Sequence, residues 1–160
     1  GISTFIVTKD NPGLKVGHME DKLGLRASDT TDLHFEDCRV PATDMLGDEG
    51  QGFKIVMKGL DGGRIGISAQ SVGVAQAAFD AAVRYAQERE QFGQTISKFQ
   101  GLRWMIADMA TEIEAARLMT FSAAEMKDRG EHYTAQASMA KLFASEMVNR
   151  ITAKAVQLHG

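Results

Sequence analysis

The sequence predicts an α+β fold in which a short strand-rich segment precedes three long helices. Hydrophobic residues alternate with polar ones within the first 41 residues, as in half-buried strands. From residue 53 onward they recur every three or four positions, as on one face of a helix. With 160 residues, of which 44 % are hydrophobic, the chain is also long enough and apolar enough for a packed core.

Residues 1–41 carry the strand signals. "STFIVTK" is rich in β-branched and aromatic residues, and "TTDLHFEDCRV" alternates, with Leu33 and Phe35 on its apolar positions. "DNPG" between these segments predicts a turn. Residues 42–52 are polar and marked by glycines, so we expect a connector there with a helix start at its end.

Residues 53–160 predict three amphipathic helices. The first runs towards Arg89, the second covers about 99–129, and the third starts near Thr134. Short connections between long helices predict an antiparallel bundle. The apolar faces are broad, so we expect a fourth helix beyond Gly160 and regard the bundle as incomplete. The residues expected to face the core are Phe53, Val56, Met57, Leu60, Ile67, Ala75, Phe79, Ala82, Ala86, Leu102, Ile106, Met109, Ile113, Ala116, Met139, Leu142, Phe143, Met147 and Ile151.

Two motifs in the helical region have both a structural and a functional interpretation. In "LDGGRIG", Asp61 and Arg64 are three apart and can pair on one helix face. The two glycines between them each weaken a helix by about 1 kcal/mol relative to alanine, which indicates close approach of a neighbouring helix or of a ligand. In "EREQFG", Arg89 either interacts with the helix dipole or offers a planar fork to a phosphate or carboxylate.

Composition excludes several other classes of protein. The net charge of −3 argues against nucleic acid as the main partner, and no apolar run is long enough for a membrane helix. A single cysteine, Cys38, fits a reducing compartment and lacks a partner that would make it a nucleophile. The four histidines are scattered without the spacing of metal ligands, so we expect no metal site.

Several motifs in order resemble the acyl-CoA dehydrogenase family. They are "KLGLRASDTTDLHFEDCRVP", "LGDEGQGF", "LDGGRIGISAQSVGVAQAAFDAAVRYAQEREQFGQTISKFQ", "ASMAKLFASE" and "AVQLHG", which together span nearly all of the chain. The resemblance implies that residues 1–41 are the end of a β-barrel-like middle domain, 42–52 a connector, and 53–160 most of a C-terminal four-helix bundle. "LDGGRIGIS" and "ASMAKLFASE" look most like the short-chain and short-branched-chain members.

The resemblance also implies a cofactor site and a substrate site. In the family, the arginine of R-x-x-F-G reaches the diphosphate of an FAD held by the neighbouring subunit. Here that residue is Arg89, with Phe92 beside the cofactor and Gln100 at its adenosine part. The segment "QLHG" approaches the same FAD, and "DGGR" matches the segment that binds acyl-CoA. The corresponding residues are Gln157, Leu158, His159 and Gly160 for FAD, and Asp61, Gly62, Gly63 and Arg64 for the substrate.

The family's catalytic base is not expected among these residues. Most members carry a glutamate downstream of the segment that matches "QLHG", which places it beyond Gly160. A minority carry the base one residue before the arginine of "DGGR", a position that is Gly63 here. Glu88 and Glu90 are better interpreted as solvated carboxylates at a helix end. The resemblance therefore predicts that this chain alone is inactive.

The family oxidises an acyl-CoA thioester to its 2-enoyl-CoA and passes the electrons to an electron-transferring flavoprotein. Shared FAD implies an oligomer, most often a homotetramer. The enzyme is cytoplasmic if bacterial and belongs to the mitochondrial matrix if eukaryotic. Two alternatives remain at this point. One is the same fold with different flavin chemistry, as in an acyl-CoA oxidase, a flavin monooxygenase or an enzyme for sulfur-bearing acyl-CoAs. The other is a helical scaffold without a cofactor.

Overall fold

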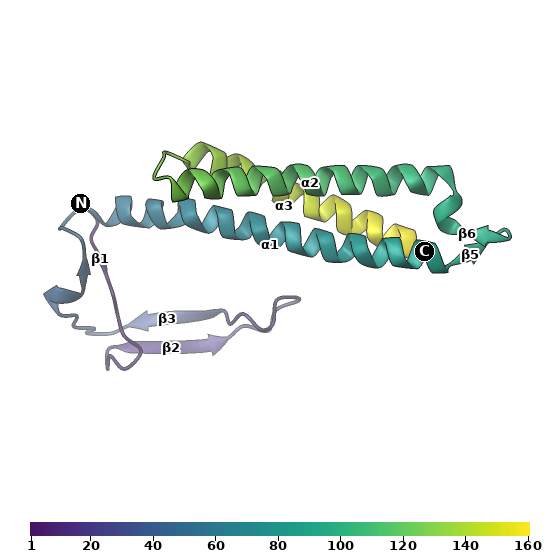
Figure 1. The fold of residues 1–160 in the computed structure, drawn as a ribbon. Coiled ribbons are helices and arrows are strands. Elements are labelled where there is room, and N and C mark those ends of the chain that lie inside the picture. Colours follow the sequence, from purple (N-terminus) through teal and green to yellow (C-terminus); the bar gives the residue numbers. More distant parts are fainter. The chain divides into compact units, whose positions relative to one another are not determined.

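The computed structural model describes all of residues 1–160, which form two compact units, 1–57 and 58–160. The first unit holds the strands β1 (Thr4–Phe5), β2 (Leu14–Met19), β3 (Thr31–Phe35) and β4 (Met45–Leu46), with a short 3-10 turn at Ala42–Asp44. The second holds most of α1 (Gly52–Glu88), the hairpin β5 (Glu90–Gln91) and β6 (Gln94–Thr95), a 3-10 turn at Ile96–Lys98, α2 (Gln100–Asp128) and α3 (Thr134–His159) (Figure 1). The predicted fold class is confirmed.

In the first unit there are two antiparallel strand pairs, and all of their strands except β4, which lies in the predicted connector, fall within the predicted strand region 1–41. β2 pairs with β3 so that Leu14 faces Phe35 and Val16 faces Leu33, and the register shifts between Val16 and Met19. Leu33 and Phe35 thus share one face of a ribbon, as their alternation predicts, yet both remain exposed because the ribbon has only two strands. "STFIVTK" forms only the two-residue strand β1, which pairs with β4.

α1 begins at the end of the predicted connector. Gly47 and Gly50 adopt left-handed backbone conformations, with φ of +67° and +81°, in the turns before the helix. Gly52 starts the helix with its N–H bonded to the carbonyl of Ile2 at 2.8 Å. A Cβ at Gly52 would lie 2.7 Å from the backbone of Ser3, so no larger residue fits there without movement.

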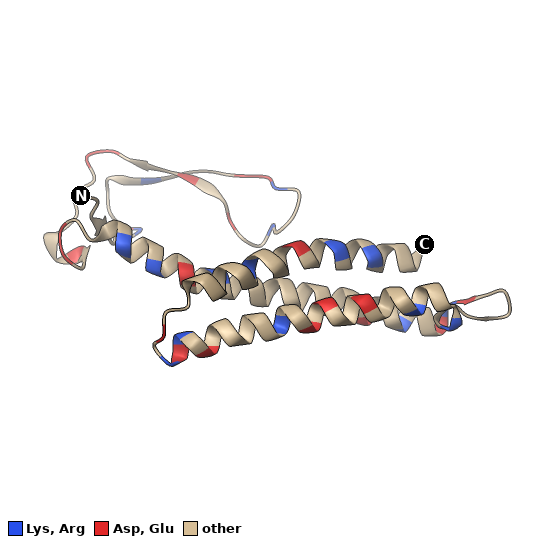
Figure 2. Cartoon of the chain, turned by 90° about the horizontal axis from the view of Figure 1, so that it is seen from above, with Lys and Arg blue, Asp and Glu red and all other residues tan.

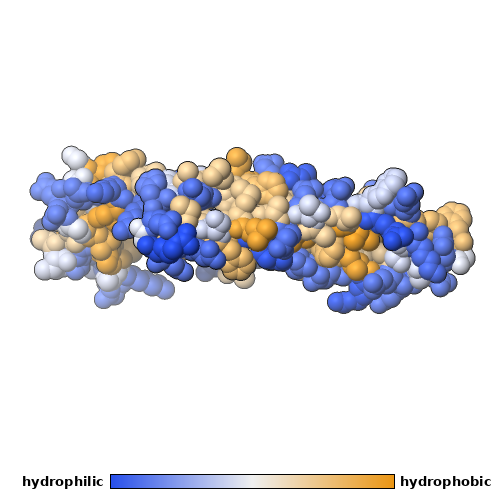
Figure 3. All heavy atoms as spheres, turned by 45° about the horizontal axis from the view of Figure 1, so that its top comes forward, coloured by the Kyte–Doolittle hydropathy of each residue, from blue (hydrophilic) through white to orange (hydrophobic).

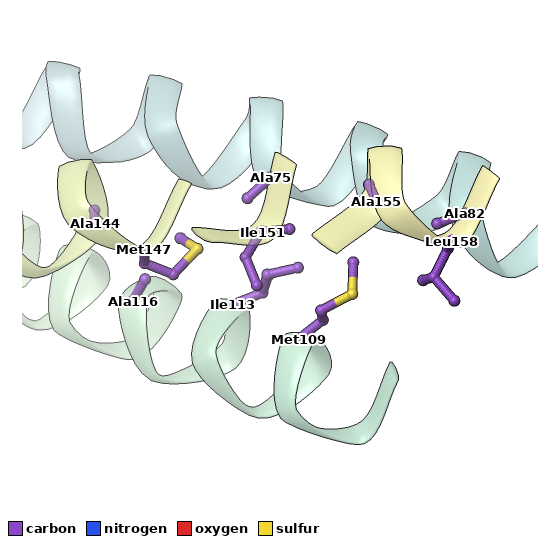
Figure 4. Packing of buried hydrophobic residues seen from close by; sticks show 10 residues of the cluster. All are labelled: Ala75, Ala82, Met109, Ile113, Ala116, Ala144, Met147, Ile151, Ala155 and Leu158. Atoms are coloured by element: carbon purple, nitrogen blue, oxygen red, sulfur yellow. The ribbon is translucent and has the colours of Figure 1, made fainter. Parts of the chain in front are cut away.

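The second unit is a three-helix assembly with an alanine-rich interior. α2 and α3 pack most closely, and Met109, Ile113, Met147 and Ile151 fill the space between them (Figure 4). Alanines on all three helices, such as Ala75, Ala116 and Ala144, are fully buried. Small side chains let the helices approach one another, and the few long ones then fill the remaining volume.

Two parts of the predicted core are wrong. In α3, Met139 and Leu142 are exposed, because Ala137, Ala140 and Ala144 turn the core-facing stripe towards a neighbouring face. In the first half of α1, five predicted core residues are exposed: Phe53, Val56, Met57, Leu60 and Ile67. Leu102 and Ile106 of α2 are partly buried against the core, as expected.

The helix surfaces mix charged and apolar residues. Acidic and basic residues are intermixed along the helices (Figure 2). Apolar side chains also reach the surface (Figure 3). Trp104, Leu118 and Phe121 of α2 are exposed. None of the helices is both long enough and apolar enough to span a bilayer.

Candidate functional site

The ends of α1 and α3 meet at a cavity of about 250 Å³ beside the β5–β6 hairpin, where the C-terminus lies in Figure 1. We call it the end cavity. It is lined by Tyr85, Arg89, Gln91, Ile96, Leu102, Gln157, Leu158, His159 and Gly160. Five of the seven residues predicted for FAD, Arg89 and the whole of "QLHG", therefore lie around one space, although 68 positions separate Arg89 from Gln157 in the sequence.

Arg89 is held at the junction between helix and hairpin by its backbone. Its N–H donates to the carbonyl of Tyr85 at 2.8 Å, which continues α1 by one hydrogen bond. Its carbonyl accepts from the N–H of Ile96, also at 2.8 Å, and this bond closes the hairpin. The guanidinium forms no ion pair or hydrogen bond within the chain, although Glu88 and Glu90 are its sequence neighbours. An arginine with a fixed backbone and an uncommitted fork is suited to a phosphate or carboxylate.

The end cavity fits a diphosphate-bearing group such as FAD. Arg89 supplies a permanent cation, and the side-chain amides of Gln91 and Gln157 supply neutral donors. Two apolar residues, Ile96 and Leu158, are buried and close its floor. No acidic side chain lines the cavity itself.

Two predicted cofactor residues lie outside the end cavity. Gln100 is the exposed first residue of α2. Phe92 lies at the tip of the hairpin with 93 % of its surface exposed, and its ring meets Phe99 edge to face at 6.2 Å. Phe92 and Gly93 have φ of +53° and +78°, the conformation of a type I′ turn. That conformation suits Asn-Gly and strains a phenylalanine by about 1–2 kcal/mol.

The predicted substrate segment lies towards the other end of α1. Arg64 pairs with Asp61 one turn earlier, as the spacing predicts. The hydroxyl of Thr134, the first residue of α3, donates to the second carboxylate oxygen of Asp61 at 2.7 Å. The Asp61 side chain is only 15 % exposed and the Arg64 side chain 30 %, so the pair is partly shielded from water.

The glycines of this segment leave open space. A Cβ added at Gly63 would meet no atom within 4 Å, and one at Gly62 would meet only the Lys127 ammonium at 3.5 Å. Close packing of a neighbouring helix of this chain therefore does not explain why Gly62 and Gly63 are glycines. A groove of about 250 Å³ runs beside them between α1 and α3 and is lined by Leu60, Gly63, Arg64, Ile67 and Lys141.

Sequence reasoning missed several residues around both places. Tyr85, Gln91 and Leu102 line the end cavity, while Thr134 and Lys141 join the Asp61–Arg64 segment. One signal was available: Tyr85 precedes Arg89 by four positions, so the two residues share a helix face. The others come together through packing of distant segments, which has no local signature.

Comparisons with known proteins show what this chain is similar to. Residues 50–160 match the family model described as acyl-CoA dehydrogenase, C-terminal domain. The chain is 53 % identical over all of its length to a short-chain specific acyl-CoA dehydrogenase of Clostridium acetobutylicum, of which it covers 42 %. It is 49 % identical over its whole length to an acryloyl-CoA reductase (NADH) of Anaerotignum propionicum, of which it covers 41 %.

Solved structures resemble the chain equally well. The butyryl-CoA dehydrogenase of Megasphaera elsdenii matches with a TM-score of 0.98 and 48 % identity, covering all of this chain and 42 % of that one. A chain solved in work on the electron-transferring flavoprotein of Acidaminococcus fermentans matches with a TM-score of 0.97 and 54 % identity, with the same coverage. The present chain thus spans about two fifths of the length of these relatives.

Proposed function

Because this chain belongs to the acyl-CoA dehydrogenase family, we propose that the protein containing it is an FAD-dependent acyl-CoA dehydrogenase. The substrate proposed is a short or branched acyl-CoA, which becomes the 2-enoyl-CoA, with the electrons passed on to an electron-transferring flavoprotein. The observation that carries the proposal is the end cavity, in which an uncommitted Arg89 meets Gln157 and His159 from α3. The short-chain relative and the flavoprotein-associated structure support the substrate class and the partner.

In this proposal the chain binds and orients, while the bound FAD supplies the acceptor for the hydride. Arg89 donates to the cofactor's diphosphate, and the amide of Gln157 adds a neutral hydrogen bond. Near the other end of α1, the open space above Gly62 and Gly63 admits the thioester and its pantetheine arm. Asp61 keeps Arg64 in one orientation through their ion pair, and Thr134 in turn holds Asp61. Fixed orientation of both reactants is what such a reaction requires of its protein.

The spacing of the two sites supports a cofactor shared between subunits. Arg64 and Arg89 are 25 positions apart on a helix that rises 1.5 Å per residue, which separates them by roughly 37 Å. Hydride transfer requires direct contact between the flavin and the substrate. The Arg64 site and the Arg89 site of one subunit therefore serve two different flavin–substrate pairs. The strained, exposed Phe92 at the hairpin tip is suited to reach a neighbouring subunit. We therefore propose a homo-oligomer, and a tetramer by analogy with the family.

No residue of this chain is proposed as the base that removes the α-proton. Glu88 and Glu90 are exposed and lie at the Arg89 end of α1, roughly 37 Å from the substrate segment. Gly63 occupies the position used by a minority of the family and has no side chain to accept a proton. The base is expected downstream of the segment ending in Gly160. The compartment proposed is the cytoplasm in a bacterium and the mitochondrial matrix in a eukaryote.

The first test is the visible absorption spectrum of the purified full-length protein, before and after anaerobic addition of a short acyl-CoA. A flavin band that bleaches supports both the cofactor and the oxidation. Replacing Arg89 with alanine removes charge-assisted hydrogen bonds and is expected to weaken FAD binding about 10- to 100-fold. Arg84→Ala, five positions earlier and outside the end cavity, is the matched control. Equal FAD affinity in both variants and the wild type would refute the role of Arg89.

A second candidate is the same chemistry in the reductive direction. The relative named acryloyl-CoA reductase (NADH) is nearly as similar as the short-chain dehydrogenase, and this observation alone favours it. Anaerobic reduction of the flavin, followed by addition of an enoyl-CoA or of an acyl-CoA in separate experiments, distinguishes the directions. The reductase is favoured if enoyl-CoA reoxidises the reduced flavin much faster than acyl-CoA bleaches the oxidised flavin.

A further inference from the structure

The end cavity contains one aromatic contact that the proposed function does not use. The rings of Tyr85 and His159 stack with their centroids 4.5 Å apart and their planes inclined by 26°. Tyr85 comes from the last turn of α1, and His159 is the last residue of α3. We refer to this contact as the Tyr85–His159 stack. It joins two residues that are 74 positions apart in the sequence.

The stack fixes the orientation of His159 together with one hydrogen bond. The Nδ1 atom of His159 lies 2.8 Å from the carbonyl oxygen of Ala155. Because a carbonyl only accepts, Nδ1 carries the proton and donates it. The imidazole is thereby held by its own helix on one side and by Tyr85 on the other. The Tyr85 hydroxyl forms no hydrogen bond in the structure, so this residue acts here through its ring.

Tyr85 also connects the two halves of the end cavity. Its carbonyl accepts the N–H of Arg89 at 2.8 Å, so the backbone of Tyr85 holds the arginine. Its ring holds His159, and with it the end of α3 that brings Gln157 and Gly160 to the same space. Tyr85 thus sets the position of Arg89 relative to the end of α3.

We infer that Tyr85 is a positioning residue of the cofactor site, which holds the end of α3 against Arg89 so that both contact one phosphate-bearing ligand. The inference rests on the proposed function, since FAD is the ligand expected there. It assigns no direct contact between Tyr85 and the ligand. A ring that only filled space would affect folding stability, whereas a positioning ring affects the affinity for the ligand beyond any effect on stability.

The test compares two substitutions at Tyr85 with a matched control. Tyr85→Phe keeps the ring and removes an unused hydroxyl, while Tyr85→Leu keeps apolar volume and removes the stack. Tyr133→Leu makes the same change next to the start of α3, far from the end cavity. The apoprotein of each full-length variant is titrated with FAD to obtain Kd, and its thermal unfolding midpoint is measured without FAD.

We expect Tyr85→Leu to weaken FAD binding roughly threefold to tenfold, as loss of one aromatic stack implies. Tyr85→Phe and Tyr133→Leu should retain wild-type affinity. If Tyr85→Leu does not fold, Tyr85→Met, which also lacks the ring but is unbranched and flexible, takes its place and should bind FAD more weakly than Tyr85→Phe.

Three results would overturn the inference. The first is unchanged affinity in Tyr85→Leu while Arg89→Ala binds weakly. The second is equal loss of affinity in Tyr85→Phe and Tyr85→Leu, which would implicate the hydroxyl. The third is equal loss in Tyr85→Leu and Tyr133→Leu in step with their unfolding midpoints, which would mean a general effect on stability. Failure of the proposed function itself has a different signature: the wild type would bind no FAD, or Arg89→Ala would bind it normally.

Discussion

The link between α2 and α3 through Glu112 leads to a prediction about acid stability. Nε and Nη2 of Arg150 lie 2.9 and 2.7 Å from one carboxylate oxygen of Glu112, and Nζ of Lys154 lies 3.3 Å from the other. Burial raises the pKa of Glu112, but the hydrogen bonds and charges of Arg150 and Lys154 outweigh it and hold the pKa below its ordinary value of 4.5. The ionised carboxylate is therefore favoured in the folded protein.

The sign of the pH dependence follows from this lowered pKa. A carboxyl whose pKa is lower in the folded state stabilises the protein at pH values above its pKa in the unfolded chain. This contribution is complete near pH 7, begins to fade around pH 4.5, and is lost as the pH falls through the lowered pKa.

The size of the effect can be bounded from exposure. The Glu112 side chain is 24 % exposed, but Arg150 is 46 % exposed and Lys154 30 %, so solvent screens the interaction. We therefore expect Glu112→Gln to lower the free energy of unfolding by about 1 kcal/mol near pH 7, at the upper end for exposed pairs. With a urea dependence of about 2 kcal/mol per molar, the unfolding midpoint falls by about 0.5 M.

Urea unfolding followed by far-ultraviolet circular dichroism, near pH 7 and near pH 4, measures this effect. Glu125→Gln is the control, because Glu125 lies 3.7 Å from its only partner, Arg129, and is 71 % exposed. The difference between wild type and Glu112→Gln should shrink at the lower pH. A difference that stays the same at both pH values, or equal shifts in the two variants, would refute the reasoning.

Two further predictions separate binding from stability. Phe92→Asn should change the unfolding free energy by less than about 1 kcal/mol, because relief of left-handed strain offsets the lost contact with Phe99, while FAD binding weakens. Urea unfolding and FAD titration check this together, and unchanged FAD affinity would count against the proposed role of Phe92. Thr134→Val removes the hydroxyl donor to Asp61, and should cost about 1 kcal/mol of stability and raise the Kd for acyl-CoA. Thr134→Ser should restore both, and equal behaviour of the two variants would contradict this role.

The helices were predictable from sequence because their signals are local. The period of apolar residues located α2 and α3 to within a residue or two, and "GDEGQGF" marked the start of α1. The face of α3 that packs against the core was not predictable in the same way. Met139 and Leu142 look like core residues by hydrophobicity, but helices that approach closely bury alanines, and neighbouring alanines decided which face turned inward.

The candidate site required more than periodicity. Nothing local indicates that Arg89 and Gln157 line one cavity, and their association was expected only from the family resemblance. The same applies to Thr134, which finds Asp61 from 73 positions away. The strain at Phe92 is a feature of backbone geometry, so it became visible only in the structure.

The uninterrupted course of α1 has a consequence for how this sequence can change over time. Advancing 25 positions at about 100° each brings Arg89 to within about 20° of the direction of Arg64, so both lie on the side of α1 that faces α3. A single inserted or deleted residue between them would rotate one site by about 100° relative to the other. Substitutions along this stretch are therefore easier to tolerate than insertions or deletions. Among short insertions, one of seven residues, close to two full turns, should change the angle between the Arg64 and Arg89 sites least.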